Sequence, residues 1–250
     1  MSARSWLLGA TLSGIMFALN AAVLFGAPPD TLAAWQMPPS LIGMTGLINT
    51  PTADVLPSGG LRLGAGFLDK DWAYHARGKS DNYHYYLTFG FVSRVEVSIR
   101  ASYFPDDQLD TATSEKGTVD RGGNARVLVL TEDRIRPAVA FGMDDVRGTR
   151  RFHSLYGVGS KTFVIKPELI RVRLSAGYAP DWIEAKDHNL FGGFGGGEVT
   201  VGKWASWAID YDTEKWNTCF RLFAFSRVTA YLALLNFEGS AGGVSWTHQF

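Results

Sequence analysis

Apolar and polar side chains alternate along most of this chain, in segments of about ten residues that are separated by polar turns. In residues 94–104, Val95 and Val97 fall on one face of an extended strand, while Glu96 and Ser98 fall on the other. No helical period is sustained after the N-terminal apolar run. The pattern is typical of strands that place one face against lipid and the other in a polar interior.

The alternation marks about twelve such strands, and bacterial outer-membrane barrels have an even strand number. They are predicted at residues 61–68, 82–91, 94–104, 122–130, 135–143, 152–164, 169–179, 190–201, 203–212, 218–227, 229–236 and 243–250. Tight turns such as Val92–Ser93 alternate with longer polar loops such as Pro105–Arg121, as periplasmic turns and external loops do. The sequence therefore predicts an all-β fold, an antiparallel transmembrane β-barrel in a bacterial outer membrane. A soluble sandwich or lipocalin is the alternative.

The N-terminus is typical of a secretory signal peptide. Arg4 is the one charge before an apolar stretch that runs from Trp6 to Phe25. An uncleaved helical anchor is the alternative, since the run approaches the length that spans a bilayer. We expect a signal peptide over residues 1–34, an N-terminal motif over 35–60 and the barrel over 61–250.

Charge and cysteine content exclude several functions. Lys+Arg and Asp+Glu both number 24, so no basic surplus is available for binding nucleic acid. Cys219 is the only cysteine, which excludes an internal disulfide and a cysteine zinc site. The run Gly192–Gly197 lacks the Lys-Ser/Thr pair of a phosphate-binding loop. We expect no cofactor and no metal ion.

Catalytic side chains are not recognisable in the pattern. His153 and Ser154 are adjacent, and neighbouring residues of a strand point to opposite faces, so they cannot form a dyad there. His84 is expected in the interior as a hydrogen-bonded polar residue. We expect no enzyme activity; an outer-membrane lipid-modifying enzyme is the less favoured hypothesis.

Several charged residues are expected to point into the barrel. The expected cations are Arg94, Arg100, Arg126, Arg136, Lys161, Arg171, Arg173 and Arg221, and the expected anions are Glu96, Glu198 and Asp210. A cationic surplus in a channel would attract an anionic polymer. The alternative is a network of ion pairs that fills the interior.

The segment Ser40–Ala53, with the sequence SLIGMTGLINTPTA, resembles the opening motif of the YjbH-like exopolysaccharide-biosynthesis barrel proteins. Residues 142–149 and 191–212 resemble later motifs of that family in the same order. The resemblance implies an outer-membrane β-barrel that takes part in the secretion or assembly of exopolysaccharide or capsule. It implies no catalytic residue.

The same motif has a physical interpretation of its own. Its glycines and prolines interrupt regular structure, while its apolar residues need burial. We therefore hypothesise that residues 36–58 form a plug in or across the periplasmic mouth. The residues that define this plug motif are Gly43, Gly46, Leu47, Ile48, Pro51 and Thr52.

The last predicted strand carries alternating aromatic residues. Trp246, His248 and Phe250 share one face. They resemble the terminal signal that is read by the outer-membrane insertion machinery. The expected partners are therefore outer-membrane lipid and that machinery. The family resemblance adds polysaccharide and periplasmic polysaccharide-export proteins. We expect a channel or an export partner; a scaffold that anchors a larger envelope complex is the alternative.

Overall fold

The computed structural model describes residues 37–70, 80–108, 116–148, 153–183 and 190–250. The predicted signal peptide, residues 1–34, lies outside them. The described residues form twelve strands: β1 (Gly60–Leu68), β2 (Asn82–Phe91), β3 (Val95–Gln108), β4 (Lys116–Leu130), β5 (Ala138–Gly148), β6 (Ser154–Lys166), β7 (Ile170–Ala179), β8 (Gly192–Val201), β9 (Ala205–Tyr211), β10 (Trp216–Ala224), β11 (Val228–Leu235) and β12 (Gly239–Gln249). Within this part of the chain, no helix is long and apolar enough to cross a membrane.

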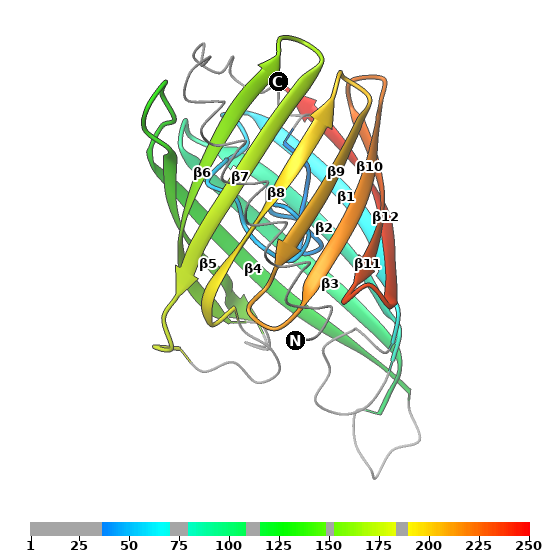
Figure 1. Cartoon of the computed structure of the whole chain (residues 1–250). Helices are drawn as coiled ribbons and strands as arrows, with labels where there is room; N and C mark the ends of the chain where they lie inside the picture. Colours follow the sequence, from blue (N-terminus) through cyan, green and yellow to red (C-terminus); the bar gives the residue numbers. More distant parts are fainter. Residues whose placement is uncertain (1–36, 71–79, 109–115, 149–152, 184–189) are drawn as a thin grey trace, which may run out of the picture.

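The strands form one closed antiparallel barrel (Figure 1). Each strand pairs with its neighbours in the sequence, and β1 closes the cylinder on β12 through pairs from Gly60–Gln249 to Leu68–Ala241. Closure leaves no unpaired sheet edge, because every strand has a partner on both sides. The predicted all-β antiparallel barrel is confirmed.

The two ends of the barrel differ. Tight connections at residues 92–94, 167–169, 202–204 and 225–227 lie at the end that also holds Phe250, and we call it the turn end. The opposite end, where β1 finishes and β2 begins, is called the loop end. The turn-end hairpin at Phe225 and Ser226 has two consecutive positive φ angles, 54° and 53°, which match the right-handed twist of the strands that it joins.

Several strands are longer than their alternation predicts. β3 runs to Gln108 and β4 begins at Lys116, so the loop predicted over Pro105–Arg121 is largely strand. β12 likewise begins at Gly239 and not at residue 243. Backbone pairing needs no apolar side chain, so a ladder continues past the point where the hydrophobic pattern ends.

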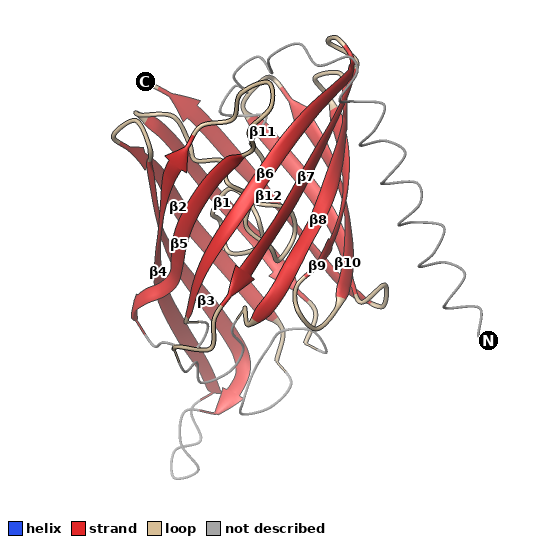
Figure 2. Ribbon diagram, turned by 60° about the vertical axis from the view of Figure 1, so that its left-hand side comes forward, coloured by secondary structure: helices blue, strands red, loops and turns tan. Residues whose placement is uncertain are grey.

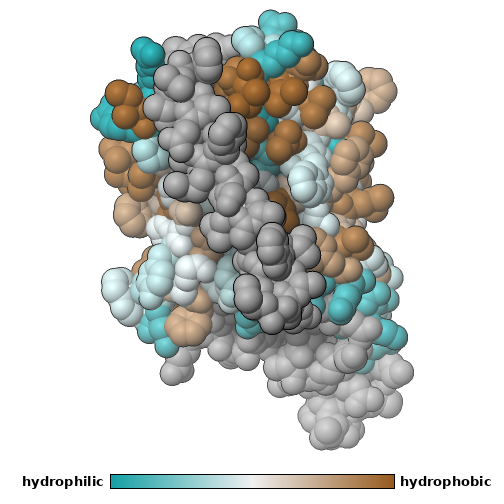
Figure 3. All heavy atoms as spheres, viewed as in Figure 1, coloured by the Kyte–Doolittle hydropathy of each residue, from teal (hydrophilic) through white to brown (hydrophobic). Residues whose placement is uncertain are grey.

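The barrel is apolar outside and polar inside. On β3, the side chains of Val97 and Ile99 are exposed on the outer face, while Glu96, Ser98 and Arg100 are buried inside. Figure 3 shows apolar side chains spread over the wall and hydrophilic ones gathered toward both ends. This distribution is the reverse of a water-soluble barrel, whose apolar side chains face inward.

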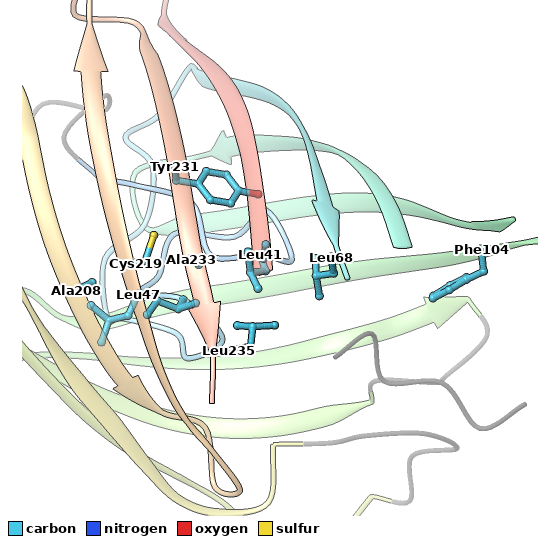
Figure 4. Close-up of a cluster of buried hydrophobic side chains, with 11 residues drawn as sticks. Leu41, Leu47, Leu68, Phe104, Ala208, Cys219, Tyr231, Ala233 and Leu235 are labelled. Atoms are coloured by element: carbon cyan, nitrogen blue, oxygen red, sulfur yellow. The ribbon is translucent and has the colours of Figure 1, made fainter. Parts of the chain in front are cut away.

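Residues 37–59, which we call the inner segment, lie within the barrel (Figures 1 and 2). Leu47 and Ile48 of this segment are fully buried and belong to an apolar cluster with Phe104 of β3 and Leu235 of β11 (Figure 4). Ala53 belongs to a second cluster, with residues of the wall from β5 to β8. The inner segment therefore supplies part of the core of a barrel whose own inward residues are mostly polar.

Two glycines allow the inner segment to approach the wall. Gly43 has a φ of 92°, and a Cβ atom there would lie 2.4 Å from the ring of Tyr86. Gly90 of β2 faces the segment, and a Cβ atom there would lie 2.0 Å from the carbonyl oxygen of Pro57. Because that neighbour is backbone, the collision cannot be relieved by rotating a side chain.

We predict that Gly90→Ala destabilises the folded barrel by about 1–3 kcal/mol, the usual cost of overpacking. Gly193→Ala is the matched control, because a Cβ atom at Gly193 meets nothing within 4 Å. Its effect should stay within about 0.5 kcal/mol. Urea unfolding of the purified protein in detergent micelles measures both. Equal stabilities for the two variants would contradict the close packing of residues 56–57 on β2.

Candidate functional site

The carboxylate of Asp210, on β9, binds the backbone of the inner segment. Its Oδ2 accepts the N–H groups of Ile48, Asn49 and Thr50 at 3.0, 2.8 and 2.9 Å, and the hydroxyl of Thr50 at 3.0 Å. Its Oδ1 accepts the amide of Asn217 at 2.9 Å. Three consecutive N–H groups that converge on one anion form a tight turn around it. Asp210 therefore fixes the conformation of residues 48–50.

Glu96, on β3, plays the same part on the other side of the barrel. It accepts the N–H and the hydroxyl of Thr45 at 2.7 and 2.6 Å, and the N–H of Leu56 at 2.7 Å. Hydrogen bonds to a charged group contribute roughly 1.5–3 kcal/mol each. Glu96 thus holds the segment at two positions, Thr45 and Leu56, and the residues that Asp210 holds lie between them.

Arg126, on β4, supplies the complementary donors. One terminal nitrogen, Nη1, donates to the carbonyl oxygens of Thr45, Thr52 and Asp54 at 2.6, 2.8 and 2.9 Å. The phenol oxygen of Tyr156 accepts from Nε and Nη2 at 3.3 and 3.2 Å. The guanidinium therefore joins two stretches of the inner segment to β6.

Three further arginines contact the segment. Arg62 of β1 donates to the carbonyl oxygen of Met37, and Arg221 of β10 donates to that of Leu47. Arg221 also pairs with Glu198 at 2.7 Å. Arg173 of β7 forms an ion pair with Asp54.

These contacts come from strands all around the barrel. The contacting side chains are Arg62 of β1, Glu96 of β3, Arg126 of β4, Arg173 of β7, Asp210 of β9 and Arg221 of β10. The inner segment is therefore bound across the lumen and is not confined to one side of the wall.

Most of the predicted interior residues lie inside. Those that face the interior are Glu96, Arg100, Arg126, Arg171, Arg173, Glu198, Asp210 and Arg221. All but Arg171 are buried, and Arg171 is partly buried. Arg100 pairs with Asp120 of β4 at 3.0 Å.

Two predicted interior residues lie in turns. Arg94 is exposed and donates to the carbonyl oxygen of Val129, so the inward placement predicted for it is wrong. Arg136 is also exposed, in the turn between β4 and β5, where it binds Asp133. The backbone N–H and the guanidinium of Arg136, with the N–H of Ile135, lower the pKa of Asp133 to about 2. Both arginines lie beyond the strand ends, where alternation no longer sets the direction of a side chain.

Lys161 is a third correction. It lies between the inward-facing residues Ser160 and Thr162 of β6, so its side chain leaves the strand on the outer face. Its ammonium reaches Glu132 at 3.3 Å in the β4–β5 turn.

The expected surplus of cations is also wrong. Among the described residues, five arginines are buried, against seven carboxylates: Glu96, Asp120, Asp144, Asp145, Glu198, Asp210 and Asp212. Arg62 is an interior cation that the prediction missed, although the alternation of residues 61–68 places it opposite Leu61 and Leu63. Asp120, Asp144 and Asp145 were missed because they fall in segments predicted as loops.

The six residues of the predicted plug motif all lie within the inner segment. Gly46 and Pro51 form an isolated backbone bridge that closes a small loop around Asp210. Leu47 and Ile48 are buried in the apolar cluster, Gly43 lies against Tyr86, and the carbonyl of Thr52 binds Arg126.

The predicted insertion-signal residues form a row on the outer face of β12. The rings of Trp246 and His248 are stacked with centroids 5.5 Å apart, and Phe250 meets His248 edge-on at 4.6 Å. Their role as an insertion signal remains a prediction.

His84 and Ser154, the histidine and serine considered for catalysis, each contact another residue. His84 Nε2 lies 3.2 Å from the hydroxyl of Tyr231, and Ser154 Oγ accepts the N–H of Leu190 at 2.7 Å. Within the described ranges, no group of three His, Cys, Asp or Glu side chains is placed to hold a metal ion.

Comparison with known families gives a match over residues 40–195 to the family model described as exopolysaccharide biosynthesis protein YbjH. The matched region begins in the inner segment, ends in β8 and covers more than half of the chain. It includes Glu96, Arg126 and Arg173. No curated protein matches the chain.

We predict that Asp210→Asn loosens the inner segment and lowers the free energy of unfolding of the barrel by about 3 kcal/mol. The substitution replaces a charged acceptor with a neutral amide, which faces three N–H donors. Hydrogen exchange at Ile48–Thr50 should accelerate more than exchange in β9. Glu238→Gln, at an exposed carboxylate in a turn, is the control and should change neither property. Unchanged exchange at residues 48–50 in Asp210→Asn would rule out the role of Asp210.

Proposed function

The chain belongs to the YjbH family of exopolysaccharide-biosynthesis proteins, and on this premise we propose that it is a non-enzymatic outer-membrane barrel that takes part in exopolysaccharide or capsule export or assembly. Its proposed role is that of a plugged channel or a partner of the export machinery. The observation that carries the proposal is the inner segment, bound across the lumen by Glu96, Arg126 and Asp210.

Outer-membrane location is supported by the distribution of side chains. Large apolar residues such as Ile99, Phe141 and Leu232 are exposed on the outer wall. Contact of such side chains with water is unfavourable, whereas contact with lipid chains is not. The strand number is even, and four of the five three-residue connections lie at the turn end, with the fifth, 236–238, at the loop end; short connections therefore predominate at one end, as periplasmic turns do. The lipid of that membrane and the insertion machinery are accordingly proposed partners, and periplasmic export proteins would meet the turn end.

The contents of the barrel support the proposal of a plugged lumen. Buried carboxylates outnumber buried arginines among the described residues, and most of these groups bind one another or the inner segment. The interior therefore does not present the cationic lining that would draw an anionic polymer through an open pore. A polymer passes only if the inner segment leaves its site.

A scaffold that conducts nothing is the second candidate. The same contacts favour it, because each buried charge that loses its partner on the segment incurs a desolvation cost. The two functions differ in whether the segment is ever displaced.

We predict that deleting residues 38–56 opens the lumen. In planar bilayers the full chain should show little or no conductance, and the deletion variant should show steady open channels. Gly193→Ala, which carries the whole segment, should behave as the full chain does. Circular dichroism and the shift in gel migration on heating establish that each protein is folded.

A large steady conductance from the full chain would contradict the plug. Silence from both folded proteins would favour the scaffold. Deleting the gene in its native host tests the wider proposal, because extracellular polysaccharide should fall; an unchanged amount would contradict a role in export or assembly.

A further inference from the structure

A cavity of about 90 Å³ lies between the inner segment and the loop end of the barrel. Its polar wall comes from adjacent strands: Asn82 and His84 of β2, Ser102 of β3 and Asn124 of β4. Asn82 is the first residue of its strand, which places the cavity near the loop end. The volume would hold about three waters at roughly 30 Å³ each, and so two or three hydroxyl groups of a larger ligand.

Four buried polar atoms of this wall have no hydrogen-bond partner among the described residues. They are Asn82 Oδ1, His84 Nδ1, Ser102 Oγ and Asn124 Nδ2. A buried polar group without a partner costs about 1–3 kcal/mol, so one such atom needs an explanation and four in one cavity point to a ligand or to bound water.

Two of these side chains, His84 and Asn124, are oriented by a contact that their second polar atom makes. His84 Nε2 contacts the hydroxyl of Tyr231 at 3.2 Å, which leaves Nδ1 as the unpartnered nitrogen of this lining residue. Asn124 Oδ1 accepts the N–H of Asp145 at 2.8 Å, which leaves its NH₂ group as a donor. The wall therefore presents donors and acceptors together, as a set of hydroxyl groups requires, because each hydroxyl both donates and accepts.

Another part of the wall is apolar. Leu41 and Ile42 of the inner segment, Leu68 of β1 and Leu190 line it. A pocket with one apolar side and a few fixed polar groups is the usual form of a small-molecule site. A pyranose ring has the matching form, with hydroxyl groups at its edge and C–H groups on its faces.

The charges around the cavity favour an uncharged sugar. Asp144 lines it, and the next residue, Asp145, is buried and bound through its N–H to the lining residue Asn124. The guanidinium of Arg100 also lines it and is paired with Asp120 at 3.0 Å. An acidic sugar would bring a further negative charge into a site where carboxylates already outnumber arginines.

We propose that this cavity binds one uncharged sugar unit of a polysaccharide through two or three of its hydroxyl groups. The inference rests on the proposed function and specifies where the barrel contacts its polymer. Its contacts involve the inner segment through Leu41 and Ile42, so a bound sugar packs directly on the segment that fills the lumen.

The test is binding of short oligosaccharides to the full chain, measured by isothermal titration calorimetry in a detergent without a sugar headgroup. The probes are maltotriose and cellotriose, which are neutral, and trigalacturonate, which is anionic. We expect a neutral probe to bind and trigalacturonate to bind more weakly. Ser102→Val, which removes a hydroxyl and fills the cavity, should weaken binding about ten-fold.

Ser245→Val is the matched control, because Ser245 is an equally buried inward serine on β12 that does not line the cavity. It should bind as the full chain does. Ser102→Ala removes the hydroxyl without adding volume, and it tests the site if Ser102→Val does not fold. Equal affinity in the Ser102 and Ser245 variants overturns the proposal, as does preference for trigalacturonate or no binding of any probe to the folded chain.

Failure of this inference is distinguishable from failure of the proposed function. If gene deletion in the native host lowers extracellular polysaccharide and Ser102→Val restores it fully, the cavity is not the contact and the export role stands. If deletion leaves the polysaccharide unchanged, the export role itself fails.

Discussion

The hydrogen bonds between buried charges of the barrel wall and the backbone of residues 37–59 are the interaction on which the rest of the structure depends. A barrel of this strand number encloses more space than its own inward side chains fill. Its inner wall is polar, so whatever fills the lumen must offer hydrogen-bonding groups such as backbone N–H and carbonyl groups. An irregular segment does this, because few of its backbone groups are used in regular structure.

The same requirement explains the unusual residues of the segment. Small residues and tight bends let three N–H groups reach Asp210 and three carbonyls reach Arg126. Leu47 and Ile48 then face the few apolar patches of the interior. The segment in which the family match begins is thus also the part of the chain that completes the core.

Strand positions could be predicted from the sequence because alternation with period two is a local property, and it continues wherever one face of a strand meets an apolar phase. The partners of the interior charges could not be predicted in the same way. Asp120 and Asp144 lie on parts of strands that the alternation did not reveal, and Arg94 and Arg136 lie just beyond strand ends. The net charge of the interior depends on a few residues near the strand ends. Errors of a few residues in the predicted strand bounds left out buried carboxylates and counted exposed arginines as interior, so the prediction had a surplus of cations where the structure has more carboxylates.

Membership of the YjbH family links the chain to exopolysaccharide biosynthesis, and the filled lumen limits how it can act. A role in export then requires either that the segment moves or that the barrel serves a neighbouring channel. Both depend on how firmly the wall holds the segment. If the segment is firmly held, the barrel is more suited to act as a partner of a neighbouring channel. Displacement of the segment needs a binding partner that offsets the lost hydrogen bonds.

The most direct measurement is amide hydrogen exchange of the folded wild-type protein in lipid vesicles, resolved at Thr45, Ala53 and Leu56. These amides donate to Glu96 and Ser160 of the wall and lie outside every strand. The account predicts that they are protected as strongly as amides in the neighbouring strands β3 and β6. Exchange at the rate of an unstructured chain, with the strands protected, would show that the segment is not held in the lumen and would contradict it.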